Sequence, residues 1–218
     1  MAQRTKPLRG FFAMLCVASA VVHGATNGPL RIHSKNPKLF ADKDDNPVWL
    51  TGIAVCCTGA VENGWPWISL DMIDKLAEHK GNWAHIRLGP FTGEIQNGER
   101  MAAYKKVGDK YDLNQWNDEM WSNLRVLLDH ARSKGVYIEV DIINHWVFGA
   151  PADELSPWHG RNNINDVDIF YCPITSSVPS GVVVDYLKKV AKETGDFDNV
   201  IYQIGNEEFS CKGEYSLA

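Results

Sequence analysis

The sequence lacks the short motifs that identify several large functional classes. Its 218 residues contain no C-x-x-C pair and no Cys/His spacing of the zinc-binding kind, so we predict no metal site. No Gly-x-Gly-x-x-Gly or P-loop follows any predicted strand, which argues against a nucleotide cofactor. A net charge of -5 gives no support to a nucleic-acid partner, which would favour a basic surface. What remains is an ordinary globular composition, 44% hydrophobic, that suits one core and a neutral partner.

The sequence also lacks an apolar run long enough to span a bilayer comfortably, which takes about 20 residues. The apolar run at residues 10–22 follows a segment that carries Arg4, Lys6 and Arg9 and no acid. Small residues at 18–20 and 22–24 offer cleavage sites. We therefore predict an export signal over residues 1–24, a domain over residues 25–218, and a secreted or periplasmic protein without membrane contact after cleavage. The alternative is an uncleaved N-terminal anchor.

Cysteine is also scarce, with five in the chain, and Cys16 falls within the predicted signal. Cys56, Cys57, Cys172 and Cys211 remain in the predicted mature chain. In an exported protein these four residues are compatible with disulfides or with buried free thiols. The sequence does not determine their pairing.

Hydrophobic patterning predicts strands and helices that alternate along the chain. We expect strands over residues 51–55, 83–90, 136–143 and 200–204, and helices over residues 69–80, 114–134 and 182–194. A hairpin at residues 36–50 precedes them, and polar loops at 91–112 and 144–179 follow the second and third strands. This order is typical of a parallel sheet with right-handed crossovers, either a (β/α)₈ barrel or an open doubly wound sheet. Because no nucleotide motif is present, we predict an α/β fold, a partial (β/α)₈ TIM barrel whose first four βα units follow a β-hairpin.

Polar residues close three of the predicted strands. Arg87 ends the second strand, Asn144 and His145 end the third, and Asn206 and Glu207 end the fourth. In a barrel these strand ends meet at one rim, where a buried carboxyl can serve as a general acid and an amide can bind a sugar hydroxyl. Each residue also has an ordinary structural explanation: an ion pair, a hydrogen-bonded rim histidine, or a carboxylate that caps the next helix.

Four tryptophans lie in loops that leave the same predicted rim: Trp65, Trp67, Trp146 and Trp158. Their flat apolar faces suit pyranose rings in a cleft with a few placed polar groups. The alternative is that they fix the loops to the barrel, and we expect that of at least two of them.

The segment Ile204-Gly-Asn-Glu207 resembles the acid/base signature of clan A glycoside hydrolases, which include the family 5 cellulases. Arg87 matches the Arg that ends strand two in those barrels, and the stretches at 36–52 and 161–165 are similar to cellulase-like and apiosidase-like barrels. The resemblance implies that Glu207 is the acid/base residue, that Asn206 holds the 2-hydroxyl of a carbohydrate substrate, and that Arg87 orients the nucleophile. Asn144, His145 and Trp146 would then line the sugar subsite.

The nucleophile of that group is a Glu at the end of strand seven, whereas this sequence ends soon after its fourth strand. We expect a fragment that is inactive alone; the alternative is a natural half-barrel that pairs with itself or with a C-terminal half. A rival from another class is a non-catalytic carbohydrate-binding or scaffold protein. A metal-dependent barrel hydrolase that uses His85 and His145 is less favoured, since no strand ends in His-x-His.

Overall fold

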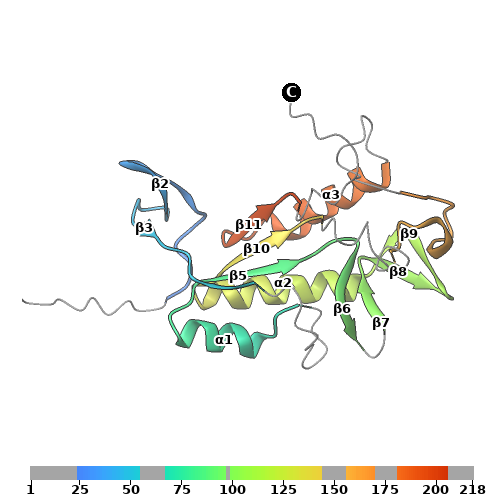
Figure 1. Cartoon of the computed structure of the whole chain (residues 1–218), viewed down its shortest axis with the longest axis horizontal. Coiled ribbons are helices and arrows are strands. Elements are labelled where there is room, and N and C mark those ends of the chain that lie inside the picture. The colour runs from blue at the N-terminus through green and yellow to red at the C-terminus, as the bar shows by residue number, and fades with distance from the viewer. Residues whose placement is uncertain (1–23, 55–66, 97–98, 144–155, 170–180, 206–218) are drawn as a thin grey trace, which may run out of the picture.

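The computed structural model describes residues 24–54, 67–96, 99–143, 156–169 and 181–205 (Figure 1). Its centre is a parallel sheet of four strands in the order β11-β10-β5-β4. These strands are β4 (Gly52–Ala54), β5 (Trp83–Arg87), β10 (Tyr137–Asp141) and β11 (Val200–Gln203). Successive strands are joined through the helices α1 (Leu70–Glu78), α2 (Asp118–Ser133) and α3 (Gly181–Thr194). The predicted alternation of parallel strands and helices is therefore confirmed.

A second, antiparallel sheet lies at the amino-terminal end of the central strands (Figure 1). It consists of β1 (Arg31–His33), β2 (Asn36–Ala41) and β3 (Pro47–Val48). Phe40 of β2 lies opposite Val48 of β3. The turn between these two strands is built around Asp42, whose carboxylate accepts hydrogen bonds from the backbone amides of Asp44 and Asn46. This turn stands at the opposite end of the sheet from Arg87.

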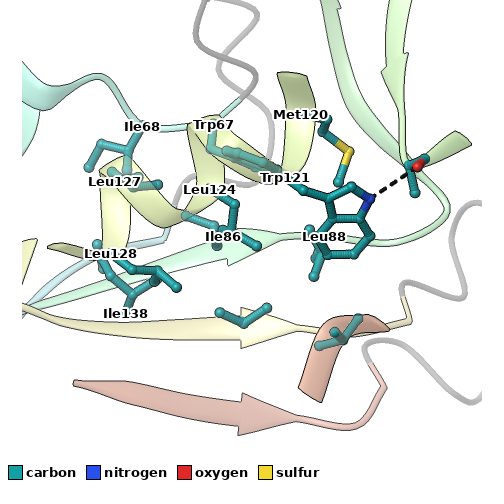
Figure 2. Close-up of a cluster of buried hydrophobic side chains, with 14 of the residues drawn as sticks. Trp67, Ile68, Ile86, Leu88, Met120, Trp121, Leu124, Leu127, Leu128 and Ile138 are labelled. Atoms are coloured by element: carbon teal, nitrogen blue, oxygen red, sulfur yellow. Dashed lines mark hydrogen bonds between the residues drawn. The ribbon is translucent and has the colours of Figure 1, made fainter. Parts of the chain in front are cut away.

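One face of the central sheet packs against helices and forms the core. The Ser69 side chain accepts a hydrogen bond from the Met72 amide and caps α1, as the sequence predicts. Figure 2 shows side chains from the strands reaching a row of apolar residues along α2. The labelled residues are Trp67, Ile68, Ile86, Leu88, Met120, Trp121, Leu124, Leu127, Leu128 and Ile138. Within the described ranges, no helix has the length and apolar character to cross a membrane.

The prediction of a polar loop at residues 91–112 is wrong, because this segment lies within two β-hairpins. They comprise β6 (Phe91–Gln96) with β7 (Glu99–Ala102), and β8 (Tyr104–Val107) with β9 (Lys110–Trp116). The second hairpin turns through Gly108 and Asp109, with a positive φ of 61° at the glycine that favours a tight turn. Both hairpins lie beyond the carboxyl ends of the central strands (Figure 1).

The predicted start of the second helix at residue 114 is also wrong. Residues up to Trp116 belong to β9, where Trp116 lies opposite Tyr104 and stacks on it with ring centroids 5.0 Å apart. The Asn117 side chain then caps α2 by accepting a hydrogen bond from the Met120 amide. Strand pairing and ring stacking thus override the helical pattern of the preceding residues.

Candidate functional site

Polar residues occupy the face of the central sheet that is turned away from the helices. Because side chains alternate along a strand, the apolar Ile86, Ile138 and Val140 point to the helices and their neighbours point the opposite way. The opposite face carries five polar side chains on three strands: His85, Arg87, Glu139, Asp141 and Gln203. We call these five residues the polar sheet face. Such a set on one side of an otherwise apolar sheet needs an explanation other than core packing.

Arg87 ends β5, the position that the sequence predicts. Its carbonyl accepts a 2.8 Å hydrogen bond from the indole Nε1 of Trp67, which fixes the backbone where the strand ends. Its side chain is half-buried, and the buried Nε has no hydrogen-bond acceptor within the described ranges. Its role in substrate binding stays a prediction.

Asp141 is the residue that the sequence analysis missed. It lies on β10 directly opposite Arg87 of β5 and Gln203 of β11. Its side chain is completely buried, and neither carboxylate oxygen accepts a hydrogen bond from the described residues. Burial raises the pKa of Asp141 from 3.8 to about 7, although the Arg87 charge and the Ile143 amide favour the charged form. Asp141 therefore titrates near neutral pH, as groups at functional sites often do.

His85 lies next to this pair on the same face. Burial lowers the pKa of His85 from its usual 6.5, and the Arg87 charge lowers it further, against opposing effects of Glu139 and Gln203. The imidazole is therefore neutral at pH 7, and its buried Nε2 has no hydrogen-bond partner among the residues that the structure describes. No three His, Cys, Asp or Glu side chains converge on a metal-sized site in the described part of the chain. The site thus combines a neutral imidazole, a buried carboxyl and a guanidinium.

The remaining predicted site residues lie outside the described residues: Asn144, His145, Trp146, Asn206 and Glu207. The described chain reaches Ile143, two residues after Asp141, and Gly205, two residues after Gln203. The roles of the five stay predictions. All four cysteines of the predicted mature chain are also outside these ranges.

Two of the four tryptophans considered as sugar platforms are buried instead. Trp67 is 4% exposed and holds the Arg87 carbonyl, while Trp158 is fully buried. The indole Nε1 of Trp158 donates a 2.9 Å hydrogen bond to the Tyr104 hydroxyl, and its ring meets Tyr186 edge-on at 5.4 Å. For these two, the prediction of a sugar-binding face is wrong and the alternative, that they fix loops, is right. Trp65 and Trp146 lie outside the described residues.

The Arg161-Asn-Asn-Ile-Asn165 run also has a structural role. The buried Asn163 amide donates hydrogen bonds to the carbonyls of Pro157, His159 and Val167, at 2.7 to 3.0 Å. Asn165 accepts a 2.8 Å hydrogen bond from the Leu113 amide and so ties the loop to β9. These residues position the loop that carries Trp158.

No protein-family model and no curated protein matches the sequence. A protein from Bacteroides vulgatus assigned as a glycoside hydrolase has a similar structure, with a TM-score of 0.59 and 12% identity over 86% of this chain and 34% of its own. A beta-mannanase from the blue mussel Mytilus edulis superposes with a TM-score of 0.50 and 12% identity over 84% of this chain and 46% of its own. A family 5 glycoside hydrolase from Bacteroides vulgatus has 17% identity over 85% of this chain and 35% of its own, at a TM-score of 0.48 that is too low to indicate a shared fold.

The chain thus spans between a third and a half of the length of these structures. A four-stranded parallel α/β sheet is compatible with part of a (β/α)₈ barrel, the architecture in which sites form at the carboxyl ends of strands. At 12% identity the likeness concerns the fold and not the chemistry. The protein shares its fold with part of a glycoside hydrolase.

Proposed function

We propose that this protein carries the acid/base part of a retaining glycoside hydrolase site. The observation that supports it is the position of Arg87, at the carboxyl end of β5 on the polar sheet face. In the proposed mechanism Glu207 protonates the glycosidic oxygen of the leaving group and later activates water. Asn206 hydrogen-bonds the 2-hydroxyl of the reacting sugar, and Asn144, His145 and Trp146 line the subsite.

Hydrolysis with retention needs two carboxyl groups about 5–5.5 Å apart. One is the acid/base residue, and the other is the nucleophile that attacks the anomeric carbon. The described carboxylates of the polar sheet face are unsuited to that attack. Asp141 is completely buried, and Glu139 accepts a 2.9 Å hydrogen bond from the Trp83 indole. We therefore propose that the nucleophile comes from further strands, which a C-terminal half of the barrel would supply. Arg87 would then orient this nucleophile and stabilise its charge.

The proposed substrate is a β-linked poly- or oligosaccharide, since a similar structure is a beta-mannanase. Export to the periplasm or the medium would bring the protein to such a substrate, and it agrees with the predicted signal at residues 1–24. A neutral, polyhydroxylated ligand suits the mixture of donors and acceptors on the polar sheet face better than a strongly charged ligand would.

Oligosaccharide binding and hydrolysis by the purified chain test this proposal. We expect calorimetry to detect binding of mannohexaose or cellohexaose, and Arg87→Ala to weaken it by roughly tenfold, the effect of losing a hydrogen bond from a charged donor. Arg31→Ala is the matched control, because Arg31 is an exposed arginine on β1, which belongs to the antiparallel sheet and not to the central sheet. We expect no release of nitrophenol from aryl β-glycosides by the chain alone.

Three results separate the alternatives. Absence of binding to any β-linked oligosaccharide would refute the proposal. Binding that Glu207→Gln leaves unchanged, in a chain that also gains no activity with its C-terminal half, would favour a non-catalytic carbohydrate-binding protein. Nitrophenol release by the chain alone, lost in Glu207→Gln, would show that it already contains the nucleophile.

A further inference from the structure

Strand β9 and helix α3 line a pocket of about 380 Å³. This volume falls within the range of roughly 300–1,000 Å³ that is usual for sites of small ligands. Helix α3 contributes Val183, Tyr186 and Val190 to the same core as Ile86 and Ile138, so the pocket lies on the helix-covered side of the central sheet. It is therefore separate from the polar sheet face, which is turned away from the helices.

One wall of the pocket is a stripe of charged residues along α3. Asp185, Lys188, Lys189 and Lys192 follow one another at steps of three, one and three residues, a spacing that places all four on one side of a helix. All four line the pocket, which we call the lysine pocket. Its lining thus holds three cations and one anion, in a chain whose net charge is -5. A concave surface of this charge attracts anions from solution.

The three lysines differ in how their charges are compensated. The Lys189 ammonium lies 2.6 Å from the Glu193 carboxylate, and both side chains are largely buried. The Lys188 ammonium lies 3.3 Å from Asp185, but these side chains are 73% and 67% exposed, so the pair is weak and easily exchanged for another partner. Lys192 is exposed and forms no ion pair with any residue that the structure describes. Lys192 and Lys188 therefore supply the charge that is available to a ligand.

The other wall, from β9, is apolar with one exposed amide. The Trp116 ring is half-buried and stacks on Tyr104 with ring centroids 5.0 Å apart, which holds it in place. Leu113 is buried beside it, and the Asn114 side chain is exposed. A rigid apolar wall suits the carbon-bound hydrogens of a sugar ring, and an amide suits its hydroxyls. A carboxylate on that sugar would accept charge-assisted hydrogen bonds from the lysines of the opposite wall.

We propose that the lysine pocket is a second carbohydrate site, which binds a sugar residue that carries a carboxylate, a uronic acid. Lys192 and Lys188 bind the carboxylate, Asn114 hydrogen-bonds a ring hydroxyl, and the ring packs beside Trp116. That the ligand is a carbohydrate rests on the proposed function, whereas the preference for an anion does not. The polar sheet face then binds the neutral part of a polysaccharide, and the lysine pocket binds an acidic residue of it.

Two disaccharides that differ in one group test this proposal. Cellobiouronic acid carries a carboxylate where cellobiose carries a hydroxymethyl group. In calorimetry with the full chain, we expect cellobiouronic acid to bind about threefold to tenfold more tightly in low salt, and this preference to disappear by about 300 mM sodium chloride. Lys192→Met should reduce the preference by about threefold, and Asp185→Asn should increase it by about twofold, because it leaves Lys188 without its acidic partner. Lys38→Met, a change of an exposed lysine on β2, is the control and should have no effect.

Nuclear magnetic resonance locates the bound sugar. The side-chain amide signal of Asn114, assigned through its loss in Asn114→Ala, should shift when cellobiouronic acid is added and stay unchanged in Lys192→Met at the same concentration. Equal affinities for the two disaccharides, or a preference that neither Lys192→Met nor Asp185→Asn changes, would overturn the inference. Acetate that binds as tightly as cellobiouronic acid would overturn the assignment of a sugar.

The same measurements separate this inference from the proposed function. Arg87→Ala should weaken the binding of mannohexaose or cellohexaose and leave the preference for cellobiouronic acid over cellobiose unchanged. If the neutral hexaoses bind but the preference is absent, the lysine pocket fails as a uronate site and the proposed function stands. If the preference depends on Lys192 and Asp185 as expected but no neutral hexaose binds, the proposed function fails and the lysine pocket stands.

Discussion

Replacing Asp141 with Asn should stabilise this protein at neutral pH, by an amount that depends on pH. Asp141 has a pKa of about 7 in the folded protein, raised by burial, against 3.8 for an ordinary Asp. Between these two values the unfolded chain releases a proton that the folded protein retains. Stability from this group is therefore complete below about pH 4 and is lost as the pH rises towards 7. A difference from 3.8 to about 7 corresponds to roughly 4 kcal/mol.

An Asn at this position cannot ionise, so the stability of Asp141→Asn does not fall as the pH rises towards 7. We expect the mutant and wild-type free energies of unfolding to be similar near pH 4, and the mutant to be more stable by up to roughly 4 kcal/mol near pH 8. Urea denaturation followed by tryptophan fluorescence measures both, since the chain contains 8 Trp. Glu139→Gln is the control and should show no comparable pH-dependent gain, because Glu139 is only partly buried and accepts a hydrogen bond from Trp83. A stability difference between Asp141→Asn and the wild type that is constant from pH 4 to 8 would refute the reasoning.

Three further predictions follow from other contacts. Gly52→Ala should lower the free energy of unfolding in urea by more than about 2 kcal/mol, because a Cβ there would lie 1.6 Å from the Trp83 carbonyl oxygen. Gly181→Ala is the control and should change the stability little, since a Cβ there would have no atom within 4 Å. Equal effects of the two mutations would contradict this prediction. Trp158→Phe should lower the free energy of unfolding by about 1–2 kcal/mol, because the hydrogen bond to Tyr104 is lost. It should leave the oligosaccharide affinity measured by calorimetry unchanged. A loss of affinity without a loss of stability would contradict the structural role of Trp158. Burial tends to raise the pKa of Asp42, but hydrogen bonds from Asn27, Asn46 and the Asp44 amide outweigh it and lower that pKa to about 2. Asp42→Asn should therefore lower the free energy of unfolding by at most about 2 kcal/mol in urea titrations at neutral pH, and by less in high salt. The difference from the wild type should vanish as the pH falls from about 4 towards 2. A lower stability of the mutant that persists at pH 2 would contradict this prediction.

The elements with strong local signals were predictable from the sequence. Ser69 caps α1 and Ile73 and Ala77 face the core, because a capping side chain and a helical apolar period act within a few residues. Arg87 was placed correctly at the end of β5, since the strand formers before it and the Gly-Pro after it mark that end in the sequence. Local chemistry fixes these positions without help from distant parts of the chain.

Features that depend on distant contacts were not predictable in the same way. The hairpin of β8 and β9 had a signal, Gly108-Asp109 between alternating residues, but its strand pairing extends to Trp116 and displaces the expected helix start. The sequence presents Asp141 only as one acid within an apolar strand. Its importance comes from the neighbours that β5 and β11 place beside it, which only the paired strands reveal. Similarly, the sequence places Trp158 in a loop that suits a sugar site, whereas in the fold it contacts Tyr104 and Tyr186 in the core.

The most direct measurement is a crystal structure of this protein with mannohexaose or cellohexaose bound. The account predicts that the sugar lies at the carboxyl ends of β5, β10 and β11, with the Glu207 carboxyl and the Arg87 guanidinium both turned towards the same ring. A Glu207 side chain directed to the helix-covered face, or a sugar bound at the end of the sheet that carries β2 and β3, would contradict it.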